Sequence, residues 1–230
     1  MVMGLEGSGK STFINSLLPN HLPPMKVGER ESFEPCTTTA EHSVLDMAAL
    51  SDTLGTQKGY RLVLVDTPGL NAREKPDSEI VADIAKWSQD VIPEGGCRGG
   101  IVFLNDLSWF QRIRDSDLRA FEQDFEMVIA TTNWTTFRES DPEPYHKAVS
   151  SRWSSSSIRA PTHAFKGSTE DAVAIVRDLL ARVEPWGEQL DIPVALDALT
   201  RRLEEKENQR RSVWEPFRNS IGMNSNTGNM

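Results

Sequence analysis

The sequence predicts an α/β fold in which helices cover both faces of a mostly parallel central sheet. The first observation is a set of three apolar runs of strand length, at residues 61–66, 100–105 and 126–131. Such nearly continuous apolar strands are expected where a sheet is buried on both faces. The second observation is that segments with helical periodicity alternate with these strands, which is typical of parallel strand–helix units.

Two weaker strands and five helices complete the predicted order of elements. The weaker strands are expected at residues 42–47 and 161–165, and the helices at residues 10–18, 78–91, 115–125, 143–151 and 168–183. The last helix has the clearest start, because Ser168 and Asp171 stand at the spacing of an N-terminal capping pair.

The chain divides into three predicted segments, which are a compact domain at 1–183, a helical extension at 184–218 and a disordered tail at 219–230. The extension carries one apolar stripe and then a run of charged residues at 204–211. This pattern fits either a helix that docks by one face or a helix that binds a partner. The stripe consists of Trp186, Leu190, Leu196, Leu199 and Leu203.

Composition and charge exclude several classes of protein. The 230 residues carry a net charge of −9, which argues against sequence-independent binding to nucleic acid. No run of about 18 apolar residues is present, so no membrane span is expected. Cys36 and Cys97 match no metal or redox spacing, and two reduced thiols in a cytoplasmic protein are therefore expected.

The strongest motif is Gly4-Leu-Glu-Gly-Ser-Gly-Lys-Ser11, which satisfies the pattern G-x-x-x-x-G-K-[ST] of phosphate-binding loops. Its glycines allow a tight turn whose N–H groups face a phosphate, Lys10 adds a positive charge, and the Ser11 hydroxyl can bind Mg²⁺. The helix that follows directs its positive dipole end to the same anion. The expected nucleotide contacts in this loop are Gly4, Glu6, Gly7, Ser8, Gly9, Lys10, Ser11 and Thr12.

The strand before this loop is expected to be short, because only three residues precede Gly4. A phosphate loop normally follows a full central strand. Either the first strand is unusually short, or the sequence begins inside a longer domain. The second interpretation predicts a loss of stability, because a central parallel strand is buried on both faces.

A second motif, Asp66-Thr-Pro-Gly69, directly follows the strand at 61–66. It therefore lies at the edge of the sheet where open α/β proteins bind their ligands. Asp66 is expected to hold Mg²⁺ through water, and the Gly69 N–H is expected to approach the γ-phosphate of a triphosphate.

With the threonine run at 37–39 and the segments at 99–104 and 128–134, these motifs resemble the G domains of TRAFAC-type P-loop GTPases. The resemblance covers about residues 1–183 and is closest to fungal AIG/GIMAP-like and septin-like proteins. It implies a three-layer P-loop NTPase fold, a bound guanine nucleotide (GTP or GDP) with Mg²⁺, and a switch driven by hydrolysis. Thr37 or Thr38 would close on Mg²⁺ when a γ-phosphate is present, and Lys10, Thr37 and Thr38 are the candidates for a catalytic role.

Base recognition departs from the family, because the usual [NT]-K-x-D reads Thr131-Thr132-Asn133-Trp134 here. The missing Asp would accept hydrogen bonds from guanine, so the preference for GTP over ATP stays open. Trp134 either stacks on the base or belongs to the core. The expected base contacts are Thr132 and Asn133, together with Gly167 and Ser168 in a second loop.

Hydrolysis is expected to be slow, because Leu70 stands where Ras-like enzymes carry the Gln that orients the attacking water. Turnover completed by a second copy, in a homodimer across the nucleotide face, also fits. The predicted function is a slow GTPase switch. The alternative is a degenerate, non-hydrolysing G domain that acts as a protein-interaction module through its C-terminal helix. A kinase of a small metabolite is a third option, which the Asp66–Gly69 motif and the threonine run disfavour.

Overall fold

The computed structural model describes residues 1–28, 36–46, 61–72, 75–92, 97–109, 114–134, 141–183 and 190–220, without the side chains of 109 and 213–220. Within these residues, six strands form one sheet in the order β2-β3-β1-β4-β5-β6. Neighbouring strands run parallel except β2 and β3, which are antiparallel. The strands are β1 (Val2–Gly4), β2 (Glu41–Asp46), β3 (Arg61–Asp66), β4 (Gly100–Asp106), β5 (Glu126–Thr132) and β6 (Thr162–Ala164).

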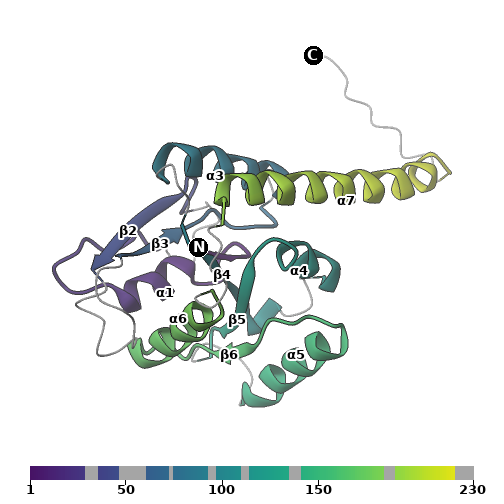
Figure 1. Cartoon of the computed structure of the whole chain (residues 1–230). Coiled ribbons are helices and arrows are strands. Elements are labelled where there is room, and N and C mark those ends of the chain that lie inside the picture. The colour runs from purple at the N-terminus through teal and green to yellow at the C-terminus, as the bar shows by residue number, and fades with distance from the viewer. Residues whose placement is uncertain are drawn as a thin grey trace.

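Helices cover both faces of this sheet, so the predicted three-layer α/β fold is confirmed (Figure 1). Helices α1 and α6 share one apolar core with the sheet, and α3, α4, α5 and α7 share the other. The helices are α1 (Lys10–Leu17), α3 (Asp77–Val91), α4 (Asp115–Phe121), α5 (Glu143–Ser155), α6 (Thr169–Val183) and α7 (Ile192–Ser220), with a short 3-10 helix at Leu107–Trp109.

Strand β4 illustrates why the apolar runs form central strands. All seven of its residues are buried, and successive side chains point to opposite faces of the sheet. Phe103 packs edge-to-face on Phe121 of α4, with ring centroids 5.6 Å apart, whereas Val102 and Leu104 belong to the core on the α1 side. Each face of the strand therefore needs apolar residues, which produces an unbroken apolar run.

Strand β1 is a buried three-residue strand in the middle of the sheet. It pairs with β4 from Val2 to Gly4, but it pairs with β3 only where Val2 meets Asp66. The Thr67 hydroxyl strengthens the junction by donating to the Val2 carbonyl at 2.9 Å. The short first strand expected from the sequence is therefore present, and it carries the phosphate loop directly.

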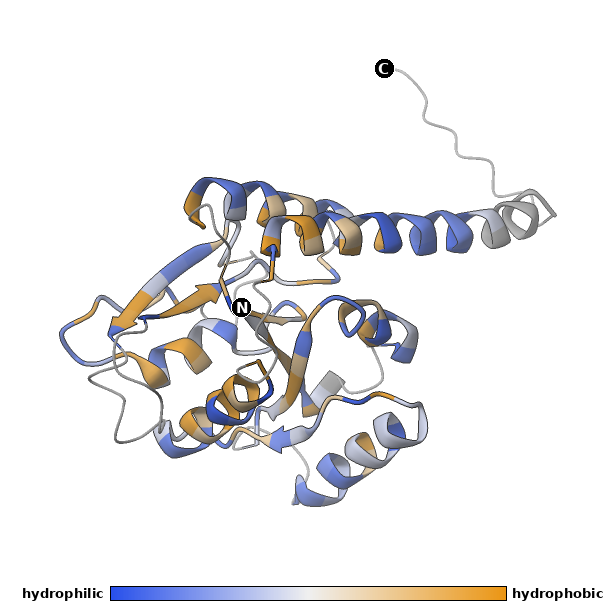
Figure 2. Ribbon diagram, viewed as in Figure 1, coloured by the Kyte–Doolittle hydropathy of each residue, from blue (hydrophilic) through white to orange (hydrophobic). Residues whose placement is uncertain are grey.

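Helix α7 docks along α3 and α4 by its first half (Figure 1). Among the side chains of α7 that the structure describes, which run to residue 212, the last buried apolar one is Leu203, and the described turns that follow it are hydrophilic (Figure 2). Polar contacts continue the docking, because Glu207 accepts hydrogen bonds from the Ser78 N–H at 3.1 Å and the Ser78 hydroxyl at 2.7 Å. Arg210 pairs with Asp117 of α4 at 2.6 Å. Of the two interpretations of the apolar stripe, the described residues fit docking by one face.

Several predicted boundaries differ from the structure, and tertiary contacts explain two of them. Helix α4 ends at Phe121 rather than at 125, because Glu122 turns to accept the N–H groups of Arg159 at 2.8 Å and Ala160 at 2.7 Å. Helix α5 runs to Ser155 rather than to 151, because Trp153 in its last turn is buried. Helix α7 includes residues 219 and 220 of the predicted tail, whereas Trp186 lies outside the described residues.

Candidate functional site

The predicted phosphate and base motifs meet at one edge of the sheet. The phosphate loop follows β1, the Asp66 motif follows β3, and the two base segments follow β5 and β6. These four strands run parallel, so their carboxyl ends share an edge, which is where α/β proteins bind ligands. The arrangement expected from the order of motifs is therefore present.

The phosphate loop has an open, glycine-built backbone. Gly7 and Gly9 adopt φ values of 73° and 88°, which residues other than glycine rarely adopt. A Cβ on either residue would meet nothing within 4 Å. Gly9 precedes α1, and no side chain caps the first turn of that helix. The first N–H groups of a helix lack partners within the helix, and such a terminus suits an anion.

Lys10 is buried at the start of α1, with 7% of its surface exposed. Its ammonium group donates to the Leu5 carbonyl at 3.0 Å. Burial lowers the pKa of Lys10 to about 8, against the opposing effect of the Asp66 and Glu6 charges. A polyphosphate beside the ammonium group would offset the cost of this buried charge.

Three of the four predicted cation ligands lie together. The Ser11 hydroxyl donates to Asp66 Oδ2 at 2.6 Å, and the Thr37 hydroxyl lies 3.4 Å from the same oxygen and 3.5 Å from Ser11 Oγ. Burial raises the pKa of Asp66, while the hydrogen bond from Ser11, the charge of Lys10 and the hydrogen bond from Thr37 lower it. Thr38, the fourth predicted ligand, is exposed, so the structure brings Thr37 and not Thr38 to this cluster.

This cluster fits Mg²⁺ rather than a metal held wholly by protein. No group of three or more His, Cys, Asp or Glu residues suited to a metal occurs within the described parts of the chain. Mg²⁺ in nucleotide sites needs only one or two carboxylates, with water and phosphate oxygens as its other ligands. Asp66 Oδ1 is buried without a hydrogen-bond partner, so one carboxylate oxygen is available to such an ion or to its water.

Gly69 lies against the phosphate loop. A Cβ at this position would come within 2.5 Å of the Glu6 Cα, so a side chain here would displace the loop. The next residue, Leu70, is 4% exposed. Its N–H donates to the Gly4 carbonyl and its carbonyl accepts the Glu6 N–H, both at 3.0 Å. Backbone contact with the loop explains the glycine, a reason that sequence reasoning missed.

On the base side, the predicted contact residues already bond to protein groups. The Thr132 hydroxyl donates to the Ser8 carbonyl at 2.9 Å, and the Asn133 amide donates to Asp106 at the end of β4. The Ser168 hydroxyl accepts the Asp171 N–H at 3.1 Å, which is the expected helix cap. The fourth residue, Gly167, has a φ of 101°. The Thr132, Asn133 and Ser168 side chains therefore support the loops at this end of the sheet.

Trp134 is a core residue with 9% of its surface exposed. Its indole N–H donates to the Thr131 carbonyl at 3.0 Å, and its ring lies 5.2 Å from that of His146. The Lys166 ammonium lies 4.8 Å from the ring centroid, close enough for a cation–π contact. Of the two interpretations left open for Trp134, burial in the core is the one that the structure supports.

Two residues of the base side, Asp106 and His146, carry no motif that the sequence analysis recognised, and they contact Asn133 and Trp134 respectively. Lys166 belongs to the second predicted base loop with Gly167 and Ser168, but its contact with the Trp134 ring was not expected. Asp106 had a weak signal, since it ends an apolar strand next to the predicted site. His146 belongs to α5, and its position in the sequence does not predict its contact with Trp134 in the loop after β5.

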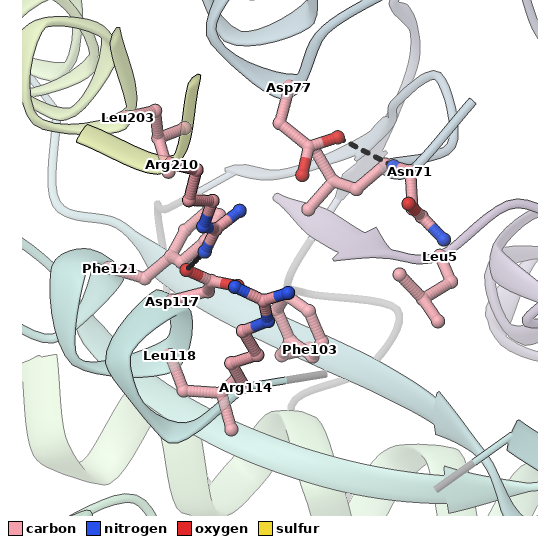
Figure 3. Close-up of a pocket in the computed structure, with 11 residues that line it drawn as sticks. Leu5, Asn71, Asp77, Phe103, Arg114, Asp117, Leu118, Phe121, Leu203 and Arg210 are labelled. Atoms are coloured by element: carbon pink, nitrogen blue, oxygen red, sulfur yellow. Dashed lines mark hydrogen bonds and ion pairs between the residues drawn. The ribbon is translucent and has the colours of Figure 1, made fainter. Parts of the chain in front are cut away.

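A pocket lies behind the phosphate loop, between Leu5, Leu70 and the first residues of α3 and α4 (Figure 3). Arg210 of α7 and Asp117 pair across one side of it. The lining contains Leu5 and Leu70 but neither Lys10 nor Ser11. This pocket is therefore a junction of the loop, α3, α4 and α7, and not the predicted phosphate site.

Comparison with known proteins gives one family. The family model described as the 50S ribosome-binding GTPase matches residues 1–129. The chain belongs to this GTPase family. The match includes the phosphate loop, Asp66 and most of β5, and it supports binding and hydrolysis of GTP. It ends before Thr131, so it does not reach the loops that follow β5 and β6.

A search of curated proteins found no match. Within the described residues, no helix is both long and apolar enough to cross a membrane.

Proposed function

We propose that this protein binds GTP together with Mg²⁺ and hydrolyses it slowly, as a switch between GTP-bound and GDP-bound states. The observation that carries this proposal is the cluster of Ser11, Thr37 and Asp66 beside Lys10. Its two hydroxyls and one carboxylate are the ligands that a nucleotide-bound Mg²⁺ requires of a protein. Bound Mg²⁺ would neutralise charge on the phosphates.

The protein's own residues have distinct roles in this proposal. The loop N–H groups and Lys10 hold the β- and γ-phosphates. Thr37 joins the cluster from a segment far from Ser11 and Asp66 in the sequence, so a γ-phosphate would hold that segment in place and its loss would release it. Turnover is expected to be slow because residue 70 is a buried Leu. Its side chain has no polar group that could orient the attacking water, as a Gln at this position would.

A second candidate is a non-hydrolysing G domain that acts as a protein-interaction module. It is favoured by Trp134 in the core where the family motif has an Asp, and by Leu70.

Three further expectations stay predictions. They are the resemblance to AIG/GIMAP-like and septin-like proteins, a homodimer across the nucleotide face and a cytoplasmic location.

Titration with fluorescent GTP and ATP analogues, with and without Mg²⁺, tests the proposal when phosphate release is then followed over hours. We expect Mg²⁺-dependent binding of GTP and slow phosphate release. Binding without release would favour the interaction module. Equal affinity for GTP and ATP would reject the preference for guanine, and no binding at all would reject both candidates.

A further inference from the structure

The proposed hydrolysis requires a group that contacts the attacking water, and Leu70 does not supply one. Its side chain is apolar and belongs to the core on the α3 side. Both of its backbone polar groups bond to the phosphate loop. Leu70 is therefore held in place by core packing and backbone hydrogen bonds. A polar contact with the attacking water must come from another residue.

Glu6 belongs to the phosphate loop and lies against Gly69, which is predicted to approach the γ-phosphate. Its Cα, Cβ and N would all lie within 2.8 Å of a Cβ on Gly69, so the two backbones touch. Its N–H also donates to the Leu70 carbonyl at 3.0 Å, which fixes the residue beside that predicted γ-phosphate contact. Its side chain is exposed, as access to a water molecule requires.

Two other carboxylates near this edge are less suited to the role. Asp66 accepts hydrogen bonds from Ser11 and Thr37 and belongs to the cation cluster. Glu41 is exposed on β2, paired with Asp66 across the strands. Strand β3 separates β2 from β1 and from the phosphate loop that follows β1.

We propose that the Glu6 carboxylate is a catalytic residue that orients the attacking water and accepts its proton. This inference rests on the proposed function. The water oxygen forms a bond to the γ-phosphorus while the bond from that phosphorus to the β–γ bridging oxygen breaks, and the bond's electron pair leaves with GDP. The proton passes to Glu6 and then to the phosphate product or solvent.

The negative charge of Glu6 is expected to affect GTP affinity and the rate of hydrolysis in opposite ways. A carboxylate near a triphosphate opposes binding by Coulomb repulsion, whereas a general base speeds hydrolysis by about 10²-fold or more. Glu6→Gln removes the charge and the base while keeping the shape. It should therefore slow hydrolysis about 100-fold and leave GTP affinity equal or higher. A residue that merely shaped the loop would lower both.

Single-turnover hydrolysis and GTP affinity, measured on the full chain with Mg²⁺, test this. Glu41→Gln is the matched control, and we expect its rate to stay within about twofold of the wild type. Added formate should restore part of the rate of Glu6→Ala, because a small carboxylate can enter the space left by the side chain.

Each outcome decides the proposal. A Glu6→Gln rate equal to that of the wild type would overturn the role of Glu6 and leave the GTPase function intact. A parallel loss of rate and affinity, without rescue by formate, would assign Glu6 a structural role instead. A wild-type protein that binds GTP without releasing phosphate would overturn both the hydrolysis and the role of Glu6.

Discussion

The phosphate side and the base side of the site lie on the same edge of the sheet but differ in how their polar groups are used. On the phosphate side, the first turn of α1 lacks a side-chain cap and one buried oxygen of Asp66 has no partner. On the base side, the hydroxyl of Thr132 and the amide of Asn133 already bond to protein groups. The phosphate side is thus arranged for an anion and a cation, whereas the base side is a supporting framework.

This difference indicates where the free energy of nucleotide binding arises. Groups that are buried and incompletely paired gain most from a ligand, because the protein alone leaves them unsatisfied. Groups that already have partners gain little. We therefore expect substitutions on the phosphate side to change affinity, and those on the base side to change mainly stability.

The largest effect is expected for Lys10→Met. Removing the charged hydrogen bonds to the phosphates should lower GTP affinity by about 100-fold or more. The free protein should become more stable, because the fold lowers the pKa of Lys10 and so disfavours its charged form. Calorimetry of binding and of unfolding measures both effects. A GTP affinity within tenfold of the wild type would contradict the view that the phosphate side supplies most of the free energy of binding.

A smaller effect separates two neighbouring threonines. Thr37→Ala should lower affinity for a non-hydrolysable GTP analogue in Mg²⁺ by about tenfold, the effect of losing one charge-assisted contact, and should leave GDP affinity unchanged. Thr38→Ala is the matched control, because Thr38 is exposed. Titrations in Mg²⁺ and in EDTA measure the difference. Equal losses in the two variants would show that the cluster does not select Thr37.

The base side should respond to mild acid through His146. Burial lowers the pKa of His146 below its usual 6.5, so the folded protein favours the neutral ring. This contribution to the free energy of unfolding is fully present above pH 6.5. It is lost as the pH falls through the lowered pKa of His146 in the folded protein. Screening by solvent at this half-buried site keeps the loss small.

Unfolding of the wild type and of His146→Gln between pH 7 and pH 5 measures this contribution. We expect the wild type to lose more stability than the variant, while GTP affinity at pH 7.5 differs by less than about threefold. The same pH dependence in both proteins would remove His146 as the cause.

The smallest effect is expected at the contact between α7 and α3. Glu207→Gln weakens two hydrogen bonds at the start of α3 and removes a negative charge from a helix N-terminus, at a cost of about 0.5–1 kcal/mol. Glu205→Gln is the matched control, because Glu205 is exposed. Thermal unfolding checks the difference. A large change in nucleotide affinity would instead mean that α7 and the phosphate side act as one unit.

The phosphate side could be predicted from sequence because its residues act through local backbone geometry. The loop from Gly4 to Ser11 closes within eight residues, and Asp66 ends a strand that is recognisable by its apolar run. The base loops could be located in the sequence, but the contacts that their side chains make could not. His146 and Lys166 meet Trp134 only because α5 and the loop after β6 lie beside β5.

Sequence alone determined the α/β class, the order of strands and helices, the phosphate loop and the carboxylate of Asp66, because periodicity and turn chemistry act over a few residues. Tertiary structure decided which threonine joins Ser11 and Asp66, since three threonines in a row offer the same chemistry. It also decided that Trp134 belongs to the core and that Gly69 touches Glu6. These contacts join residues distant along the chain, and only the packing of the sheet and helices fixes them.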